Sequence, residues 1–145
     1  MSRKKVRDPD LLLRKLRDLL AGMEYLVSAV VVEGPRDVEA LRRTGFGGRV
    51  EICSRFNVSE SDLAESLAHE IESLVILTDF DEEGRRINGH LTRLLETRGV
   101  KVEVGIRRRF GRLMAALGIH TIEALDDVVS KIEERMDPWV KGRRN

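Results

Sequence analysis

The sequence is short of several residue types, and each shortage excludes a class of protein. Cys53 is the single cysteine, so an intramolecular disulfide and a cysteine-based zinc cluster are excluded. No apolar run approaches the roughly 20 residues of a membrane-spanning helix, and the N-terminus lacks the apolar core of a secretion signal. Aromatic residues make up only 4% of the chain, which leaves few rings to stack on bases. These shortages predict a cytoplasmic protein in a reducing compartment.

Charge, by contrast, is abundant and balanced. Charged residues account for 35% of the 145 residues, compared with about 25% in typical proteins, yet the net charge is only +1. Net charge alone therefore does not indicate a nucleic-acid-binding protein. Basic residues nevertheless gather in three segments, SRKKVR at the start, IRRRFGR from position 106 and VKGRRN at the end. The length suits one domain with its own hydrophobic core.

Apolar residues recur with the periods of an α/β protein. Residues 8–21 place leucines on one face of an amphipathic helix, with Pro9 in its first turn and Gly22 after its end. Further along the chain, short apolar runs alternate with amphipathic helical segments, which predicts parallel β-α units in one layered domain. The predicted strands are residues 26–32, 49–54, 73–79 and 100–106.

Acidic residues stand directly after two of these strands. Glu33 follows the first, and Asp79 and Asp81 follow the third. Right-handed crossovers allow the strand order 2-1-3-4, which makes the first and third strands neighbours and brings all three carboxylates into one crevice. Carboxylates this close raise one another's pKa values unless a cation neutralises them, and oxygen ligands favour Mg²⁺ or Mn²⁺. We therefore predict a magnesium site suited to phosphate chemistry.

Glycines and an arginine flank these acidic residues. Gly34 and Gly84 permit a tight turn or the close approach of a phosphate, and Gly84 lies in a first helical turn, whose free amides favour an anion. Arg85 follows and is expected to contact phosphate. An Asp-x-Asp pair is by itself a weak signal, since such residues often cap helices. The pair becomes much stronger because EGPRD follows an earlier strand of the same sheet.

The segments VVVEGPRDVEAL and VILTDFDEEGRRI together resemble the two defining motifs of the Toprim domain, which occurs in topoisomerases, bacterial-type primases, nucleases and recombination proteins. The nearest likeness is to an uncharacterised archaeal group of small Toprim proteins, with the bacterial ribonuclease that matures 5S ribosomal RNA as a cousin in layout. The resemblance implies a Rossmann-like layered α/β fold with a four-stranded, mainly parallel sheet of order 2-1-3-4 flanked by helices. The expected organisation is an N-terminal amphipathic helix in residues 1–24, a Toprim domain in 25–107 and a helical C-terminal extension in 108–145.

The resemblance also assigns roles by position. Glu33 matches the family's invariant glutamate, which is implied to bind a metal ion and to act as a general acid or base at the phosphodiester. Asp79 and Asp81 match the two metal-binding aspartates, at a site for one or two Mg²⁺ ions that Mn²⁺ can replace. The recurrent supporting positions of the motifs are matched by Gly34, Asp37 and Gly84.

Basic residues extend the expected binding surface. Many relatives have lysine where this chain has Pro35, and Arg36 is expected to supply the missing charge from a different position. The segment 106–112 is expected to follow a nucleic-acid backbone, with Phe110 either stacking on a base or packing in the core. The expected nucleic-acid-binding residues are Arg107, Arg108, Arg109 and Arg112.

The function expected from these features is a magnesium-dependent phosphodiester enzyme, ribonuclease-like and acting on structured RNA. The alternative is a non-catalytic Toprim module that binds RNA or the ribosome, and a third interpretation is an oligomerisation domain, since the sequence leaves the oligomeric state open. Topoisomerase activity would need a tyrosine nucleophile on a separate domain, whereas Tyr25, the single tyrosine, is expected to pack at the edge of the first strand. Primase activity would need further domains, for which we expect no room.

Overall fold

The structure, a computed structural model, describes residues 8–54 and 57–136. The basic segments SRKKVR and VKGRRN lie outside the described residues. Four short strands alternate with helices within the described part, and none of those helices is long and apolar enough to cross a membrane. The elements are α1 (Pro9–Leu26), β1 (Ala29–Val32), α2 (Pro35–Thr44), β2 (Val50–Ile52), α3 (Glu60–Ala68), β3 (Ser73–Ile76), α4 (Glu82–Thr97), β4 (Lys101–Val102), α5 (Val104–Ala116) and α6 (Ala124–Met136).

The four strands form one parallel sheet. Its order is β2-β1-β3-β4, so the predicted order 2-1-3-4 is confirmed. Val31 at the centre of β1 pairs with Glu51 of β2 on one side and with Ile76 of β3 on the other. Because β1 and β3 are parallel neighbours, their carboxyl ends lie at the same edge of the sheet.

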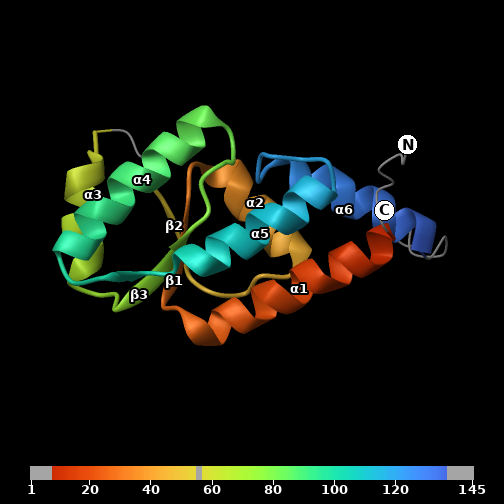
Figure 1. The fold of residues 1–145 in the computed structure, drawn as a ribbon, viewed down its shortest axis with the longest axis horizontal. Helices are drawn as coiled ribbons and strands as arrows, with labels where there is room; N and C mark the ends of the chain where they lie inside the picture. The colour runs from red at the N-terminus through yellow and green to blue at the C-terminus, as the bar shows by residue number, and fades with distance from the viewer. Residues whose placement is uncertain (1–7, 55–56, 137–145) are drawn as a thin grey trace, which may run out of the picture.

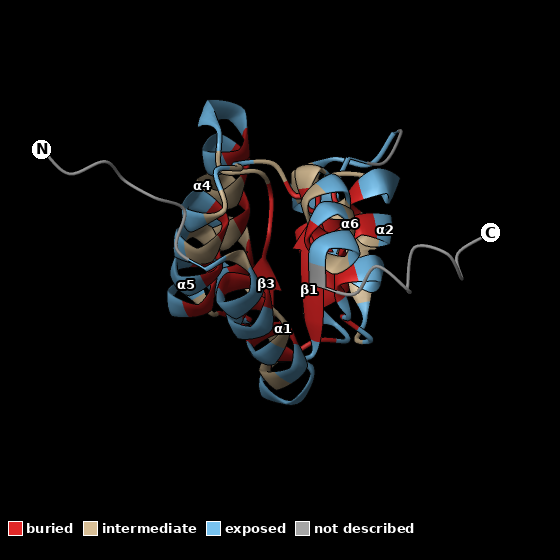
Figure 2. Cartoon of the chain, turned by 90° about the vertical axis from the view of Figure 1, so that its right-hand side faces the viewer, coloured by how far each residue is buried: buried red, intermediate tan, exposed pale blue. Residues whose placement is uncertain are grey.

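Helices cover both faces of the sheet. Alternate residues of β1 point to opposite faces, with Val30 and Val32 in one core cluster and Ala29 and Val31 in another. The first cluster contains residues of α1, α2 and α5, and the second contains residues of α3 and α4. Figure 1 shows α3 and α4 together on one side of the strands. The central strand β1 is buried throughout and β3 over most of its length, and Figure 2 shows both largely in red.

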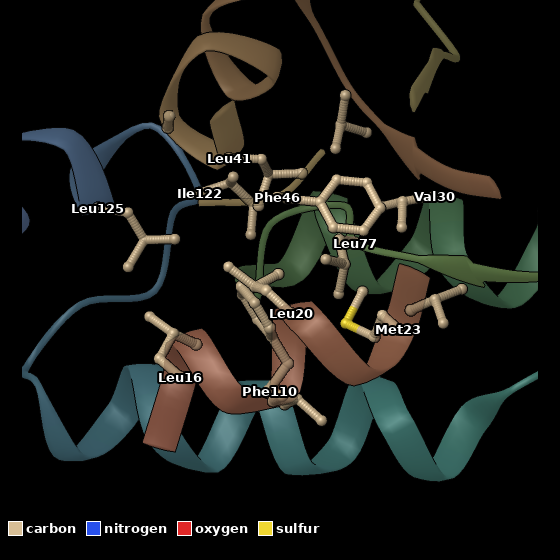
Figure 3. Packing of buried hydrophobic residues seen from close by; sticks show 14 of the residues in the cluster. Leu16, Leu20, Met23, Val30, Leu41, Phe46, Leu77, Phe110, Ile122 and Leu125 are labelled. Carbon is tan, nitrogen blue, oxygen red and sulfur yellow. The ribbon is translucent and has the colours of Figure 1, made fainter. Parts of the chain in front are cut away.

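The larger core cluster packs α1, from the first part of the described chain, and α5, from its last part, against one face of the sheet. Figure 3 shows Leu20 and Met23 of α1, Phe110 of α5 and Leu77 pointing toward one another. Helix α6 lies further out and packs on α1 and α2. Its contact with α1 is made by a small separate cluster of Leu13, Val129 and Ile132.

Helix α1 is longer than the sequence predicts. It continues through Gly22 and ends at Leu26, so the first strand begins only at Ala29. Glycine inside a helix costs about 1 kcal/mol, but the next residue, Met23, is fully buried and holds the last turns against the core. Tyr25 is 91% exposed at the end of this helix, so the expectation that it packs beside the first strand is wrong.

The predicted fourth strand is also mostly helix. Strand β4 contains only Lys101 and Val102, and α5 begins at Val104. The physical reason is the spacing of Ile106, Phe110 and Met114, which puts three buried side chains on one helical face against the sheet. The expected division of the chain between residues 107 and 108 therefore falls inside α5.

The packing of α1 gives a stability prediction with an internal control. Leu20→Ala removes a fully buried side chain and should lower the free energy of unfolding by about 2–5 kcal/mol. Tyr25→Ala, in the same helix but at an exposed position, should change it by less than about 0.5 kcal/mol. Urea unfolding followed by circular dichroism measures both values. Equal, small effects would mean that α1 does not belong to the core.

Candidate metal and phosphate site

The predicted acidic residues do meet at the carboxyl edge of the sheet. Glu33 directly follows β1, and Asp79 lies just beyond β3. The Glu33 Oε2 atom accepts a hydrogen bond from the Asp79 backbone N–H at 2.8 Å. The two residues are therefore held in direct contact by the parallel pairing of β1 with β3.

A loop that the sequence did not indicate fixes the aspartate segment. The Asp79 Oδ1 atom accepts a hydrogen bond from the Ile122 backbone N–H at 2.8 Å, and the Phe80 N–H donates to the His120 carbonyl at 2.7 Å. Asp79 and Ile122 are 43 positions apart. No local pattern could have linked them, because the contact exists only once α5 has turned the chain back to the sheet.

Two further carboxylates cap helices. Asp81 is the N-cap of α4, where its Oδ1 accepts from the Gly84 N–H at 2.8 Å. Asp37, in the first turn of α2, accepts from the Gly34 N–H at 3.0 Å and is 7% exposed. Asp81 remains exposed at the acidic edge, whereas Asp37 is buried at the start of α2.

Burial and mutual repulsion shift the titration of these groups. Burial is the main cause that raises the pKa of Glu33, and the charges of Asp79, Asp37 and Asp81 raise this pKa further. Burial likewise raises the pKa of Asp79, with smaller contributions from Asp81 and Glu123, although the Ile122 N–H opposes the shift. When folding raises the pKa of a carboxyl, the contribution of that group to the free energy of unfolding falls as the pH rises. The fall occurs between the pKa of the unfolded state and the pKa of the folded state. A bound cation would offset that loss above this range.

The donor set fits an open cation site. Glu33, Asp79 and Asp81 each direct one oxygen to a backbone N–H, and within the described residues the second oxygen of each makes no hydrogen bond. Among the same residues, no three His, Cys, Asp or Glu side chains converge closely enough to enclose an ion. Mg²⁺ takes only one or two protein carboxylates and completes its shell with water or phosphate oxygens. The residues thus suit an exposed hard cation and not a closed cage.

The two motif glycines serve different purposes. A Cβ at Gly84 would lie 1.9 Å from the Asp79 carbonyl oxygen, because the first turn of α4 lies directly on the aspartate segment. The Thr78 hydroxyl reinforces this contact by donating to the Gly84 carbonyl at 2.6 Å. Gly34, in contrast, has extended backbone, and a Cβ there would approach only Ser54 Oγ, at 4.0 Å. Packing therefore requires glycine at position 84 and not at position 34.

Arg107 lies inside the protein, contrary to its expected role on the nucleic-acid-binding surface. It is 8% exposed, and its guanidinium donates to the carbonyls of Ile76, Thr78 and Asp79 at 3.0, 2.8 and 3.1 Å. The same group stacks 4.2 Å above the centroid of the Phe80 ring. Burial lowers the pKa of Arg107 to about 10, and the nearby charge of Arg85 contributes to this shift. Arg107 therefore holds the backbone of the acidic segment in place through these hydrogen bonds.

Phe110 is likewise a core side chain. It is fully buried, and its ring lies parallel to that of Phe80 with the centroids 6.4 Å apart. Of the two interpretations of this phenylalanine, packing in the core is correct and stacking on a base is not.

The other predicted basic residues are exposed. Arg36 forms an ion pair with Glu123 at 3.3 Å. Arg85, Arg108 and Arg112 line one cavity between α4 and α5, of about 620 Å³. Arg109, with Arg112, lines a second cavity between α1 and α5, of about 490 Å³.

The parallel sheet of order β2-β1-β3-β4 and its acidic edge define the class of protein, a small α/β protein built on a Toprim domain. The family model described as Toprim domain matches residues 28–105, and the chain belongs to this family. Toprim domains typically bind divalent metal ions, and this membership implies a metal-binding fold related to nucleic acids.

Relatives of similar length refine the class. The chain is 33% identical to a UPF0292 protein of Thermococcus onnurineus over 131 residues, which cover 90% of this chain and 96% of the relative. It is 32% identical to a UPF0292 protein of Methanosarcina barkeri over 123 residues, 83% of this chain and 84% of that one. A solved structure of a protein from Aquifex aeolicus shares the fold, with a TM-score of 0.59 and 24% identity over 81% of this chain and 98% of its own. The homologues thus include archaeal UPF0292 proteins, in line with the resemblance.

The close contact at Gly84 predicts opposite effects for two Gly→Ala changes in α4. Gly84→Ala should lower the free energy of unfolding by about 3 kcal/mol or more, because the new methyl group meets backbone that cannot move aside. Gly89→Ala should raise it by about 0.5–1 kcal/mol, because its nearest neighbour is the flexible Arg93 side chain at 3.7 Å. Urea unfolding of both variants provides the measurement. A mild effect at position 84 would refute the proposed contact.

The position of Arg107 predicts that its fork-shaped side chain is needed. Arg107→Lys keeps the charge but cannot serve three carbonyls in this geometry, so it should lower the free energy of unfolding by about 1–3 kcal/mol. Arg108→Lys is the control, since this neighbouring side chain is exposed. Backbone amide NMR shifts should move at Asp79 and Phe80 in the first variant only. Unchanged shifts there would show that Arg107 does not hold this segment.

Proposed function

We propose that this protein is a magnesium-dependent enzyme that cleaves phosphodiester bonds in structured RNA. The observation that carries the proposal is the contact between Glu33 and Asp79, next to Asp81 at the N-terminus of α4. A carboxylate with a raised pKa beside two further acidic oxygens is the arrangement expected for a proton-transfer group at a metal site. Membership of a nucleic-acid-related family supports the substrate class.

In this mechanism Asp79 and Asp81 would hold Mg²⁺ through their free oxygens. A bound ion would supply positive charge to stabilise the attacking and leaving oxygens of the phosphate. The N-terminal amides of α4 and the exposed Arg85 would orient the non-bridging phosphate oxygens. Glu33 would accept or donate the proton at its Oε1 atom, since Oε2 already binds the Asp79 N–H.

A binding role without turnover is the second candidate. One observation favours it: each of the three carboxylates already stabilises a backbone N–H of the fold, so acidic residues at these positions have a structural use. In that case the domain would bind structured RNA or the ribosome through its basic residues, and binding would weaken steeply as salt increases.

Incubation with labelled structured RNA, in Mg²⁺ or in chelator, separates these candidates. The parent chain should cleave only with Mg²⁺, and Glu33→Gln should slow cleavage by about 10²–10⁴-fold. Glu39→Gln, an exposed glutamate on α2, is the matched control and should leave the rate unchanged. Cleavage by Glu33→Gln at the parent rate would refute the mechanism. Tight, salt-sensitive binding without any cleavage would favour the second candidate.

A further inference from the structure

A groove lies beside the acidic edge, between α4 and α5. Its volume of about 620 Å³ falls within the range of small-ligand sites, about 300–1,000 Å³. Its less exposed lining, called the floor below, includes Phe80, Gly111 and Ile119 together with the buried Arg107. Its exposed lining, called the rim below, carries Arg85, Arg108 and Arg112.

Among the described residues, the rim arginines have no anionic partner of their own. Within the described residues Arg85, Arg108 and Arg112 make neither an ion pair nor a hydrogen bond, whereas Arg43 and Arg49, elsewhere on the surface, are paired with carboxylates. None of the acidic residues that the structure describes lines this groove. Three unpaired cations on facing helices repel one another, and an anion between them would relieve that repulsion.

The groove lies next to the carboxylates at which the proposed phosphodiester cleavage would take place. Phe80, on its floor, stands between Asp79 and Asp81 in the sequence, and its N–H is held by the His120 carbonyl. His120 also lines the groove, and this hydrogen bond to the residue after Asp79 places it beside the acidic segment. A phosphate at the carboxylates would therefore place the flanking part of its chain between α4 and α5.

The groove suits an unpaired strand better than a duplex. A duplex presents phosphates at its surface and keeps the faces of its bases stacked inside, so apolar lining residues would find no counterpart. An unpaired strand offers phosphates to the arginines and the exposed faces of its bases or sugars to apolar lining residues such as Val104 and Ile119. A cationic rim beside apolar lining residues is the combination that single-stranded nucleic acids require.

We propose that the groove between α4 and α5 binds an unpaired RNA strand next to the scissile phosphate. The inference rests on the proposed function for the position of that phosphate. It narrows the substrate from structured RNA in general to RNA with an unpaired loop or end at the cleavage site. Binding in the groove needs no turnover, so the two proposals can fail separately.

Binding of a fluorescently labelled single-stranded RNA, and of a duplex with the same sequence, tests the groove by anisotropy. The single strand should bind at least about tenfold more tightly than the duplex. Arg108→Ala with Arg112→Ala should weaken binding of the single strand about tenfold or more. Arg14→Ala with Arg93→Ala is the matched control, because it removes the same charge from exposed positions outside the groove and should weaken binding less than about threefold.

A second variant fills the groove without changing charge. Ala115→Trp places a large side chain on an exposed, groove-lining position of α5 and should abolish the preference for the single strand. Equal affinity of the parent for both RNAs, or an unaltered preference in Ala115→Trp, would overturn the inference. If the parent prefers the single strand, Ala115→Trp loses this preference and no RNA is cleaved, the proposed binding site in the groove is supported and the proposed enzyme activity is refuted.

Discussion

A buried guanidinium beneath the end of β3 holds the acidic segment in place. Strand β4 pairs with β3 only as far as Val102 opposite Leu74, so the carbonyls beyond that point have no neighbouring strand on this side. Arg107 takes the place of the missing strand by donating to three of them, at Ile76, Thr78 and Asp79. Without such donors these buried carbonyls would each cost the fold about 1–3 kcal/mol. The positive charge of the Arg107 guanidinium is thereby held close to the carboxylates of Glu33 and Asp79.

The position of β1 could be predicted because its signal is local, a run of β-branched residues. The order of the strands followed from a general rule, the right-handed connection of parallel strands. The meeting of Glu33 and Asp79 followed from topology alone, since parallel neighbours end at one edge. The predictions that succeeded used either adjacent residues or a general rule of sheet connection.

The predictions that failed depended on which way a side chain points. Three consecutive arginines, 107 to 109, look equivalent in a sequence, and only the turn of α5 directs the first of them inward. Because residues 100–106 were expected to form a strand, the sequence did not predict that α5 begins at Val104 and directs Arg107 inward. The hydrogen bond from Ile122 to Asp79 could not be predicted for a different reason, since it joins distant segments through one backbone N–H. Both kinds of information come from packing and not from residue type.

The carboxylates are arranged for two tasks at once. Each gives one oxygen to a backbone N–H, which fixes its orientation, and in the proposed mechanism the other oxygen would be available to an ion or a proton. Such preorganisation lowers the cost of binding, because little freedom remains to be lost. Burial raises the pKa values of Glu33 and Asp79, and repulsion from the neighbouring carboxylates adds to the shift; a bound cation would favour the charged forms.

Helix α5 divides the basic segment between the inside and the outside of the protein. Arg107 faces the sheet and supports the acidic edge, while Arg108 and Arg112 line the groove beside it. The acidic residues lie within the segment 28–105 that matches the Toprim family, but these arginines follow it. The proposed chemistry would therefore rest on residues of the family segment, whereas strand selection would combine Phe80 and Arg85 of that segment with the arginines of α5 that follow it. A change in α5 could then alter the preferred nucleic acid without altering the carboxylates, provided that Arg107 is kept.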